Sequence, residues 1–171
     1  MIDDNISSTW KCARTPELLD LAGKNVWLSR VHPQHARSLF SQSHGAEADP
    51  ALWHFLAVGP FVDLDSFALW LETCTQSKDP LYFTIRDVKT SCPCGMASYS
   101  RINPTHGVVE IGNIWFGRSL KQTPQATEAI YLLTRYAFDD LGYRRLEWKC
   151  DALNEASRRA AARLGFRYEG C

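Results

Sequence analysis

The segment TPQATEAIYLLTRYAFDDLG, residues 123–142, decides how the rest of the chain is interpreted. We expect a helix that begins after Thr123, because Pro124 suits the first helical position, where its missing N–H costs no hydrogen bond. Gly142 then closes the helix as a left-handed cap. Between these two positions, apolar residues recur at steps of three or four, as in an amphipathic helix: Ala126, Ala129, Ile130, Leu133, Ala137 and Leu141.

The residues before this helix follow a period of two, which is typical of strands. Residues 81–86 alternate apolar and polar side chains, and residues 96–102 should return antiparallel to them after the turn-rich segment 87–94. A third strand is expected at residues 108–116, which are rich in branched and aromatic side chains. Gly112 lies inside that strand, where glycine usually marks a bulge or a close backbone approach, so it suggests a ligand nearby.

Two helices are expected ahead of these strands. A short strand at residues 26–31 should lead into a helix over residues 33–45, which has proline at its first position. A second helix should begin at Asp65 or Ser66, either of which can cap it, and end before residues 78–80.

The C-terminal third continues the alternation of elements. Residues 145–150 predict a strand with one solvated face, residues 154–165 a helix rich in small residues, and residues 166–168 a further strand. The predicted order is therefore strand, two helices, three strands, helix, strand, helix, strand. This order indicates an α/β (α+β) fold, a mixed sheet with helices on both faces.

Length and charge limit what the protein does. The 171 residues fit one domain, which we expect to span residues 25–171 behind a loosely ordered polar leader at residues 1–24. Nineteen basic residues balance nineteen acidic ones, so no net charge gathers nucleic acid or anionic membrane. The longest run without charge, residues 50–62, contains glycine and proline and is too short to span a membrane.

The ends and the cysteines suggest a cytoplasmic protein. The first residues are acidic and no apolar segment follows them, so we expect no secretory signal. The six cysteines are scattered through a chain large enough to fold without disulfides, and we interpret them as thiols. The pair Cys92-Pro93-Cys94 lacks both the usual zinc spacing and a second ligand pair, so we interpret it as a turn and expect no metal.

Four short motifs stand out in the C-terminal half: Ala126-Thr127-Glu128-Ala129, the helix end Ala137–Gly142, Asn154-Glu155-Ala156-Ser157 and Arg163-Leu164-Gly165-Phe166. Together they resemble the GCN5-related N-acetyltransferase (GNAT) superfamily, and within it most closely the ribosomal-protein N-terminal acetyltransferase branch. The resemblance implies a mostly antiparallel twisted sheet, acetyl-CoA as cosubstrate and an amine as acceptor.

The resemblance also implies where coenzyme A binds. A helix start that follows a strand offers free N–H groups and the positive end of the helix dipole to a pyrophosphate. Pro124 stands where the family usually has glycine and removes one donor. An ordinary helix start is the alternative interpretation of this loop. The implied cofactor-binding residues are Trp115, Phe116, Gly117, Lys121, Gln122, Thr123, Gln125, Ala126, Thr127 and Asn154.

Two residues are the candidates for catalysis. Glu110 is on the strand that resembles the family's oxyanion strand, and a partly buried glutamate can accept a proton from the amine, directly or through water. Ser157 is the nearest candidate for protonating the departing thiolate, because Ala161 stands where the family commonly has tyrosine. A solvated strand carboxylate and a first-turn serine are the structural alternatives.

The chain ends at Cys171, before a last strand that the family places at the sheet edge. We therefore expect a sheet that lacks this strand, at an edge which a second copy of the chain, as a homodimer, could fill. Two functions remain open at this point. One is an acetyl-CoA-dependent N-acetyltransferase that acts by direct attack of the amine, and the other is a catalytically silent module that binds coenzyme A or a partner chain.

Overall fold

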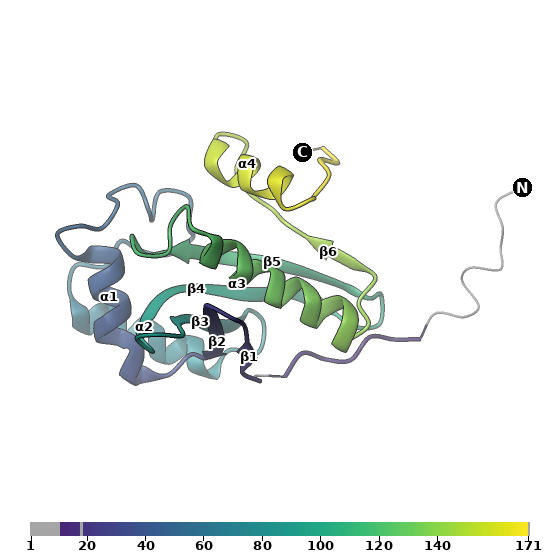
Figure 1. Cartoon of the computed structure of the whole chain (residues 1–171), viewed down its shortest axis with the longest axis horizontal. Helices are drawn as coiled ribbons and strands as arrows, with labels where there is room; N and C mark the ends of the chain where they lie inside the picture. The colour runs from purple at the N-terminus through teal and green to yellow at the C-terminus, as the bar shows by residue number, and fades with distance from the viewer. Residues whose placement is uncertain (1–10, 18, 171) are drawn as a thin grey trace, which may run out of the picture.

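The computed structural model describes residues 11–17 and 19–170 and contains one six-stranded sheet (Figure 1). The strands lie side by side in the order in which the chain makes them, and all neighbours are antiparallel except β5 and β6, which are parallel. Their bounds are β1 Leu21–Ala22, β2 Val26–Arg30, β3 Leu81–Asp87, β4 Pro93–Asn103, β5 Val108–Phe116 and β6 Arg145–Glu147. The predicted mixed, mostly antiparallel sheet is confirmed.

Four α-helices accompany the sheet. A 3₁₀ turn at Pro33–His35 precedes the first of them, and the third continues into a π-helical turn at Tyr136–Asp140. The helices are α1 Ala36–His44, α2 Leu64–Gln76, α3 Pro124–Arg135 and α4 Glu155–Arg163. None of the described helices has the length and apolar character that crossing a bilayer requires.

The helices bury the two faces of the sheet in two separate clusters, as predicted. On the α3 face, inward side chains of β2 to β5, such as Phe83, Tyr99 and Ile111, pack against Ala129 and Leu133 of α3. On the opposite face, α1 and α2 pack a cluster rich in aromatic rings against the sheet. That second cluster contains Val31, Ala36, Leu39, Trp53, Phe67, Leu71, Cys74, Met96 and Trp115.

The predicted stripe on α3 is buried, and the helix starts and ends as expected. Pro124 occupies the first helical position after Thr123, and Gly142 has a φ of 78°, in the left-handed region. The carboxylate of Glu128 accepts the backbone N–H of Asn25 at 3.1 Å and its side-chain amide at 2.9 Å, which ties α3 to the start of β2.

The start of α2 differs from the prediction. Asp63, rather than Asp65 or Ser66, caps the helix: its carboxylate accepts the N–H of Ser66 at 2.8 Å. The hydroxyl of Ser66 in turn accepts the N–H of Asp63 at 3.3 Å, which completes a capping box. Ser66 is therefore the partner of the cap and not the cap itself.

Strand lengths near the termini also differ from the prediction. Part of the predicted leader joins the sheet, because Leu21 and Ala22 form β1 against β2. The turn predicted at Cys92-Pro93-Cys94 is shorter than expected, since β4 already begins at Pro93. There the thiol of Cys94 donates to the carbonyl of Ile85 at 3.3 Å.

The prediction was wrong for the last strands. β6 stops at Glu147 instead of continuing to residue 150, and residues 166–168 form no strand. A strand needs a neighbour to satisfy its backbone groups, and among the described residues no strand flanks residues 166–168. The ring of Phe166 instead packs on Trp148, with 5.4 Å between ring centroids.

Candidate active site

The site forms where β5 loses one of its two neighbours. β5 pairs with β6 only at Val108, Val109 and Glu110, the last opposite Glu147. Beyond Glu110 it stays paired with β4 as far as Phe116, while β6 diverges toward α4 (Figure 1). The second half of β5 thus has no described strand on its β6 side, and this edge leads directly to the start of α3.

The predicted residues Trp115, Phe116 and Gly117 end this open half of β5. The indole of Trp115 is buried among the aromatic residues of the α1/α2 cluster, so its side chain serves packing. The N–H of Gly117 donates to the carbonyl of Cys94 at 2.8 Å and is already used. A Cβ at Gly117 would lie 2.8 Å from the backbone oxygen of Cys94, a close approach that favours glycine there. Backbone N–H groups alternate in direction along a strand, so the N–H of Trp115 faces β4, as that of Gly117 does, and the N–H of Phe116 faces the open edge. The backbone of Phe116 is therefore the candidate for contact with a ligand.

The loop after Gly117 leads to the N-terminus of α3. Thr123 caps the helix, because its hydroxyl accepts the N–H of Ala126 at 3.3 Å and donates to the carbonyl of Leu120 at 2.6 Å. Gln122 has a φ of 60°, in the left-handed region. Within the described chain, the backbone N–H groups of Gln122 and Gln125 have no acceptor. The first turn of α3 therefore offers donors and the positive dipole end to an anion, even with Pro124 in place.

Arg163, which was not among the predicted site residues, also lies at the start of α3. The guanidinium of Arg163, in the last turn of α4, donates to the hydroxyl of Thr127 at 2.9 Å. The two residues are 36 positions apart, and only the docking of α4 beside α3 brings them together. Arg163 opens one of the four family motifs, but nothing in that motif predicted its contact with Thr127.

The lysine that the sequence predicted for this anion site has a carboxylate partner. Lys121 forms a salt bridge with Asp49, from the segment that joins α1 to α2. The hydrogen bond from Lys121 holds the pKa of the Asp49 carboxyl below its usual range. Since both side chains are partly exposed, a phosphate can compete with Asp49 for the ammonium group.

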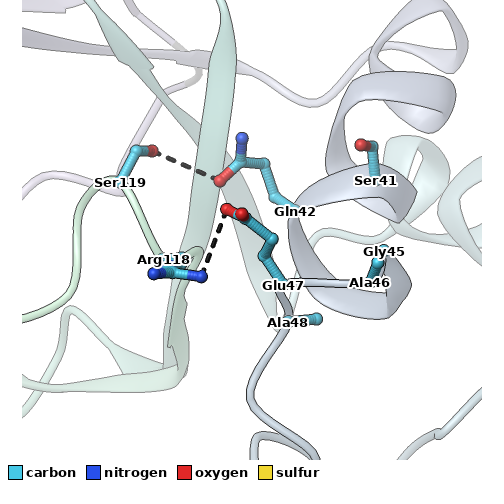
Figure 2. A pocket seen from close by; sticks show the side chains of 8 residues that line it. All are labelled: Ser41, Gln42, Gly45, Ala46, Glu47, Ala48, Arg118 and Ser119. Atoms are coloured by element: carbon cyan, nitrogen blue, oxygen red, sulfur yellow. Dashed lines mark hydrogen bonds and ion pairs between the residues drawn. The ribbon is translucent and has the colours of Figure 1, made fainter.

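A cavity of about 440 Å³ lies beside this loop (Figure 2). The guanidinium of Arg118 pairs with Glu47 at 3.2 Å, and the hydroxyl of Ser119 donates to Gln42 at 3.2 Å. These contacts connect the loop after β5 to the end of α1. The cavity is lined by Ser41, Gln42, Gly45, Ala46, Glu47, Ala48, Arg118 and Ser119.

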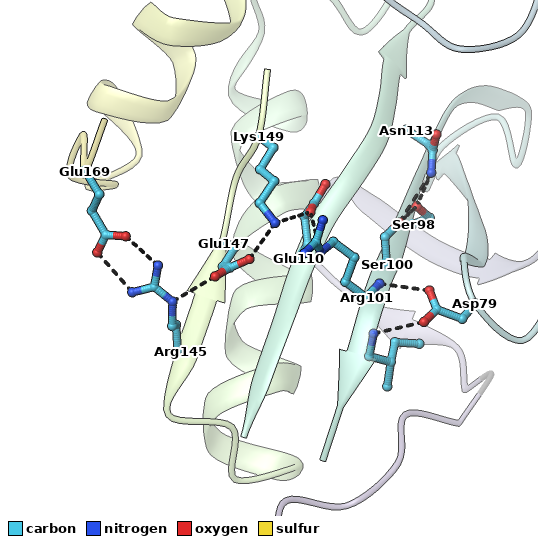
Figure 3. A network of polar contacts seen from close by, with 11 residues as sticks. Asp79, Ser98, Ser100, Arg101, Glu110, Asn113, Arg145, Glu147, Lys149 and Glu169 are labelled. Atoms are coloured by element: carbon cyan, nitrogen blue, oxygen red, sulfur yellow. Dashed lines mark hydrogen bonds and ion pairs between the residues drawn. The ribbon is translucent and has the colours of Figure 1, made fainter. Parts of the chain in front are cut away.

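Glu110 lies at the last pair before β5 and β6 diverge, and its side chain is only 13% exposed (Figure 3). Its Oε2 atom is buried without a hydrogen-bond partner in the described chain. The nearest cations are Lys149 Nζ at 3.4 Å and Arg101 Nε at 3.9 Å, which form ion pairs with Oε2 but no hydrogen bond. Oε2 is thus an acceptor that no hydrogen bond within the described residues uses, beside two cations.

The neighbouring carboxylate of Glu147 differs in this respect. Its Oε1 accepts a hydrogen bond from Arg145 Nε at 2.9 Å, and its Oε2 forms an ion pair with Lys149 Nζ at 2.9 Å. The bonds from Arg145 and then Lys149 lower the pKa of the Glu147 carboxyl. Glu147 is thus an engaged structural anion, whereas Glu110 keeps an oxygen free of hydrogen bonds.

The two predicted residues of α4 both have structural contacts. Asn154 caps the helix, its side-chain oxygen accepting the N–H of Ser157 at 3.0 Å. The hydroxyl of Ser157 accepts the indole N–H of Trp148 at 2.9 Å. Because the indole is the donor, the hydroxyl hydrogen of Ser157 remains available to another acceptor. Ala161 is half-buried on the same helix.

Comparison with known proteins identifies the fold. Residues 25–167 match the family model described as an acetyltransferase (GNAT) domain. The chain belongs to the GNAT acetyltransferase family. This family membership confirms the resemblance that the motifs in α3 and α4 predicted.

Solved GNAT structures align over nearly the whole chain. A GCN5-related N-acetyltransferase from Brucella melitensis is 38% identical, with a TM-score of 0.91, over 95% of this chain and 74% of its own. A probable GNAT-family acetyltransferase from Chromobacterium violaceum is 35% identical, with a TM-score of 0.86, over 95% of this chain and 81% of its own. No match was found among curated proteins.

More distant GNAT structures share the fold alone. The microcin C7 self-immunity acetyltransferase MccE, solved with acetyl-CoA and AMP, is 22% identical, with a TM-score of 0.74, over 86% of this chain and 82% of its own. RimL, a ribosomal L7/L12 alpha-N-protein acetyltransferase, is 20% identical, with a TM-score of 0.74, over 90% of this chain and 83% of its own.

In this GNAT domain the predicted residues fall into three groups. The loop and first turn of α3 bring together the residues from Lys121 to Thr127, and Arg163 adds a cation that was not predicted. Glu110 lies where β5 and β6 diverge and forms an ion pair with Lys149. The residue before Lys149 is Trp148, whose indole donates to Ser157, so the segment after β6 connects the two predicted catalytic residues. Trp115 packs its side chain in the α1/α2 cluster and Gly117 donates its N–H to Cys94, so the N–H of Phe116 between them is the remaining candidate.

Proposed function

We propose that this acetyltransferase moves the acetyl group of acetyl-CoA to a primary amine, of a protein N-terminus or a small molecule, by direct attack of the amine. The observation that carries the proposal is the divergence of β6 from β5 at Glu110. It joins in one place an unpaired strand edge, the donor-rich start of α3 and a nearly buried carboxylate with an oxygen that has no hydrogen bond.

Acetyl-CoA would bind with its pyrophosphate at the first turn of α3. The N–H groups of Gln122 and Gln125, the ammonium of Lys121 and the guanidinium of Arg163 supply the donors and positive charge that compensate for Pro124. The side chain of Thr127 orients Arg163. The N–H of Phe116 would then face the thioester oxygen at the open edge of β5.

Glu110 would prepare the amine for attack. An amine attacks a thioester only as the neutral base, so one proton of the ammonium form must be removed. The Glu110 carboxylate accepts this proton, directly or through one water molecule. The amine nitrogen then bonds to the acetyl carbon, the carbon–sulfur bond breaks with its electron pair on the thiolate, and the nitrogen releases its second proton to solvent.

Ser157 is the candidate partner of that thiolate. Its oxygen is held by the indole of Trp148, so its hydroxyl hydrogen is free to bond the departing sulfur and pass on a proton from solvent. Ala161 offers no acidic group on the same helix. This assignment therefore predicts a slower thiolate release than a tyrosine would give.

A silent module that binds coenzyme A is the second candidate function, and Ala161 together with Pro124 favours it. Titration with acetyl-CoA and desulfo-CoA in a thermal shift experiment tests binding. Ligand at one hundred times its dissociation constant should stabilise the fold by about 2.7 kcal/mol. Release of free thiol from acetyl-CoA over a panel of peptides, amino-acid amides and polyamines tests catalysis.

The two candidates give different outcomes in this pair of experiments. Stabilisation together with amine-dependent thiol release supports the acetyltransferase. Stabilisation without thiol release for any amine supports the silent module. An absence of stabilisation at millimolar ligand contradicts both.

We further propose a cytoplasmic location, because the described cysteines are free thiols, as expected in a reducing compartment. The homodimer stays a prediction. Light scattering of the purified chain with and without acetyl-CoA measures its mass and decides between monomer and dimer.

A further inference from the structure

The open half of β5 begins at a bulge. Met96 pairs with Trp115 and Ser98 with Gly112, so one residue of β4 lies opposite two residues of β5, Asn113 and Ile114. Asn113 has a φ of 50°, a left-handed conformation that asparagine tolerates better than most residues. The bulge lies three residues beyond Glu110, the last residue that β6 pairs with.

The side chain of Asn113 is fastened to β4 by two serines (Figure 3). Its amide nitrogen donates to the hydroxyl of Ser98 at 2.9 Å and, over a longer 3.4 Å, to that of Ser100. Ser98 is fully buried and Ser100 is 9% exposed. A Cβ at the neighbouring Gly112 would lie 3.2 Å from Oε1 of Glu110, so the group is packed closely against that carboxylate.

The donors and acceptors of this group match one another. The single hydroxyl hydrogen of Ser98 goes to the carbonyl of Gly112 at 3.1 Å. The 3.1 Å contact between the two serine hydroxyls must therefore have Ser100 as its donor. Each hydroxyl then also accepts from Asn113. The amide nitrogen of Asn113 and both serine hydroxyls are thus engaged, which favours one geometry of the bulge.

We propose that Asn113 is a positioning residue for acetyl transfer and acts through Ser98 and Ser100. Their hydrogen bonds fix the bulge, and the bulge sets the direction in which the N–H of Phe116, on the open edge of β5, faces the acetyl carbonyl. This inference rests on the proposed function. Since the amide nitrogen of Asn113 donates to Ser98 and Ser100, we assign its side chain no contact with either cosubstrate.

The replacement Asn113→Gly tests this role, because glycine keeps the positive φ and removes only the amide. We expect kcat to fall roughly ten- to hundredfold, as for a small misplacement of the reacting groups. The KM for acetyl-CoA should change less than threefold. Ser91→Gly is the matched control: Ser91 also has a positive φ, 58°, but lies in the exposed β3–β4 turn, so its kcat should not change.

The double variant Asn113→Gly/Ser98→Ala separates positioning from a general loss of stability. If Asn113 acts through Ser98, the double variant should lose no more kcat than the worse single variant. A kcat of Asn113→Gly within twofold of the wild type, or fully multiplicative losses in the double variant, would overturn the proposal.

A second measurement does not depend on turnover. The amide resonances of Ile114 to Phe116 should differ between protein saturated with acetyl-CoA and protein saturated with CoA, and Asn113→Gly should abolish this difference. If the difference persists in the variant, the positioning role is wrong. If the wild type acetylates no amine but shows the difference, the proposed reaction fails while the role of Asn113 stands.

Discussion

The two faces of the sheet have different compositions although the same strands make them. The face covered by α3 is apolar from β2 to β5, with Phe83, Ile111 and Leu133 fully or almost fully buried. The face toward α1 and α2 is aromatic at one end, but in the middle it carries buried polar groups such as Thr84, Ser98 and Ser100. Glu110 and Asn113 extend this polar strip toward β6.

This difference indicates that neighbouring residues of β5 serve different purposes, one the stability of the core and the next the site. Ile111 points to the α3 face and contributes burial, whereas Glu110 points to the other face, where it has an oxygen without a hydrogen bond. Polar groups are costly to bury without full satisfaction. Their concentration on one face, beside the strand divergence, is therefore the mark of the site. Each prediction below changes one side of this comparison.

The largest effect is expected from Glu110→Gln. Removal of a general base typically costs 10²- to 10⁴-fold, and we expect a loss in that range for kcat/KM with a reactive amine. The unfolding free energy should change little. Steady-state thiol release measures the first and urea denaturation the second. Glu147→Gln, which removes the other carboxylate paired with Lys149, is the control and should retain activity within a fewfold; equal losses would refute the assignment of the base.

The reverse pattern is expected from Ile111→Ala. Truncating a buried isoleucine should lower the unfolding free energy by about 2–5 kcal/mol. Its kcat, measured well below the unfolding transition, should stay near that of the wild type. Leu153→Ala is the control, because Leu153 is 80% exposed and its replacement should cost less than about 0.5 kcal/mol. A stability cost for Ile111→Ala no larger than this control would contradict the description of the α3 face.

A smaller effect is expected at the start of α3. Arg163→Gln should weaken binding of desulfo-CoA roughly five- to tenfold, since one charge-assisted contact with phosphate is lost. Calorimetric titration measures this change. Arg159→Gln removes a cation from the same helix that pairs with Glu155 instead, and should leave affinity unchanged. Equal affinities for the two variants would show that Arg163 does not contact the cofactor.

A still smaller effect, of opposite sign, is expected from Asp49→Asn. This change frees Lys121 from its carboxylate partner, so desulfo-CoA should bind about two- to fivefold more tightly at low salt. The gain should shrink as ionic strength rises, because the groups are partly exposed. Weaker binding of desulfo-CoA to this variant would mean that Asp49 orients Lys121 instead of competing for it.

The pH dependence of stability tests the polar strip at its other end. His35 contacts the hydroxyl of Thr84 at 3.0 Å, and burial, then Arg86 and His32, lower the pKa of His35 to about 4. The unfolded chain binds this proton near pH 6.5, so the folded state loses stability as pH falls from about 6.5 toward 4. His35→Gln should flatten this loss in denaturation curves at pH 7 and pH 5. His106 lies in an exposed turn, so His106→Gln should leave the loss of stability between pH 7 and pH 5 unchanged. If both variants lose as much stability as the wild type over this range, His35 is not the cause of the loss.

The sequence predicted the features of this comparison that depend on local pattern. Pro124 and Gly142 gave the ends of the α3 region, and the period of two in residues 81–86 and 96–102 gave the central hairpin. Gly112 correctly indicated an irregular strand, although the extra residue is its neighbour Asn113. The box formed by Asp63 and Ser66 was missed because Asp65 is an equally good cap by composition.

The parts that were not predicted depend on contacts between distant segments. β6 stops at Glu147 because no described strand continues alongside it, and nothing within residues 145–150 signals this end. Arg163 meets Thr127 only after α4 has docked, and Ser157 receives the indole of Trp148 by the same docking. Local sequence therefore predicted the helices and strands of the scaffold, whereas the ion pairs and hydrogen bonds of the site could be identified only from the folded structure.

Amide hydrogen exchange with and without acetyl-CoA tests the central claim most directly. We predict new protection in the second half of β5, residues 111–116, and at residues 122–127 of the loop and first turn of α3. The paired first half of β5, residues 108–110, should exchange as slowly without the ligand as with it. Protection confined to other segments, or none at saturating acetyl-CoA, would contradict the account.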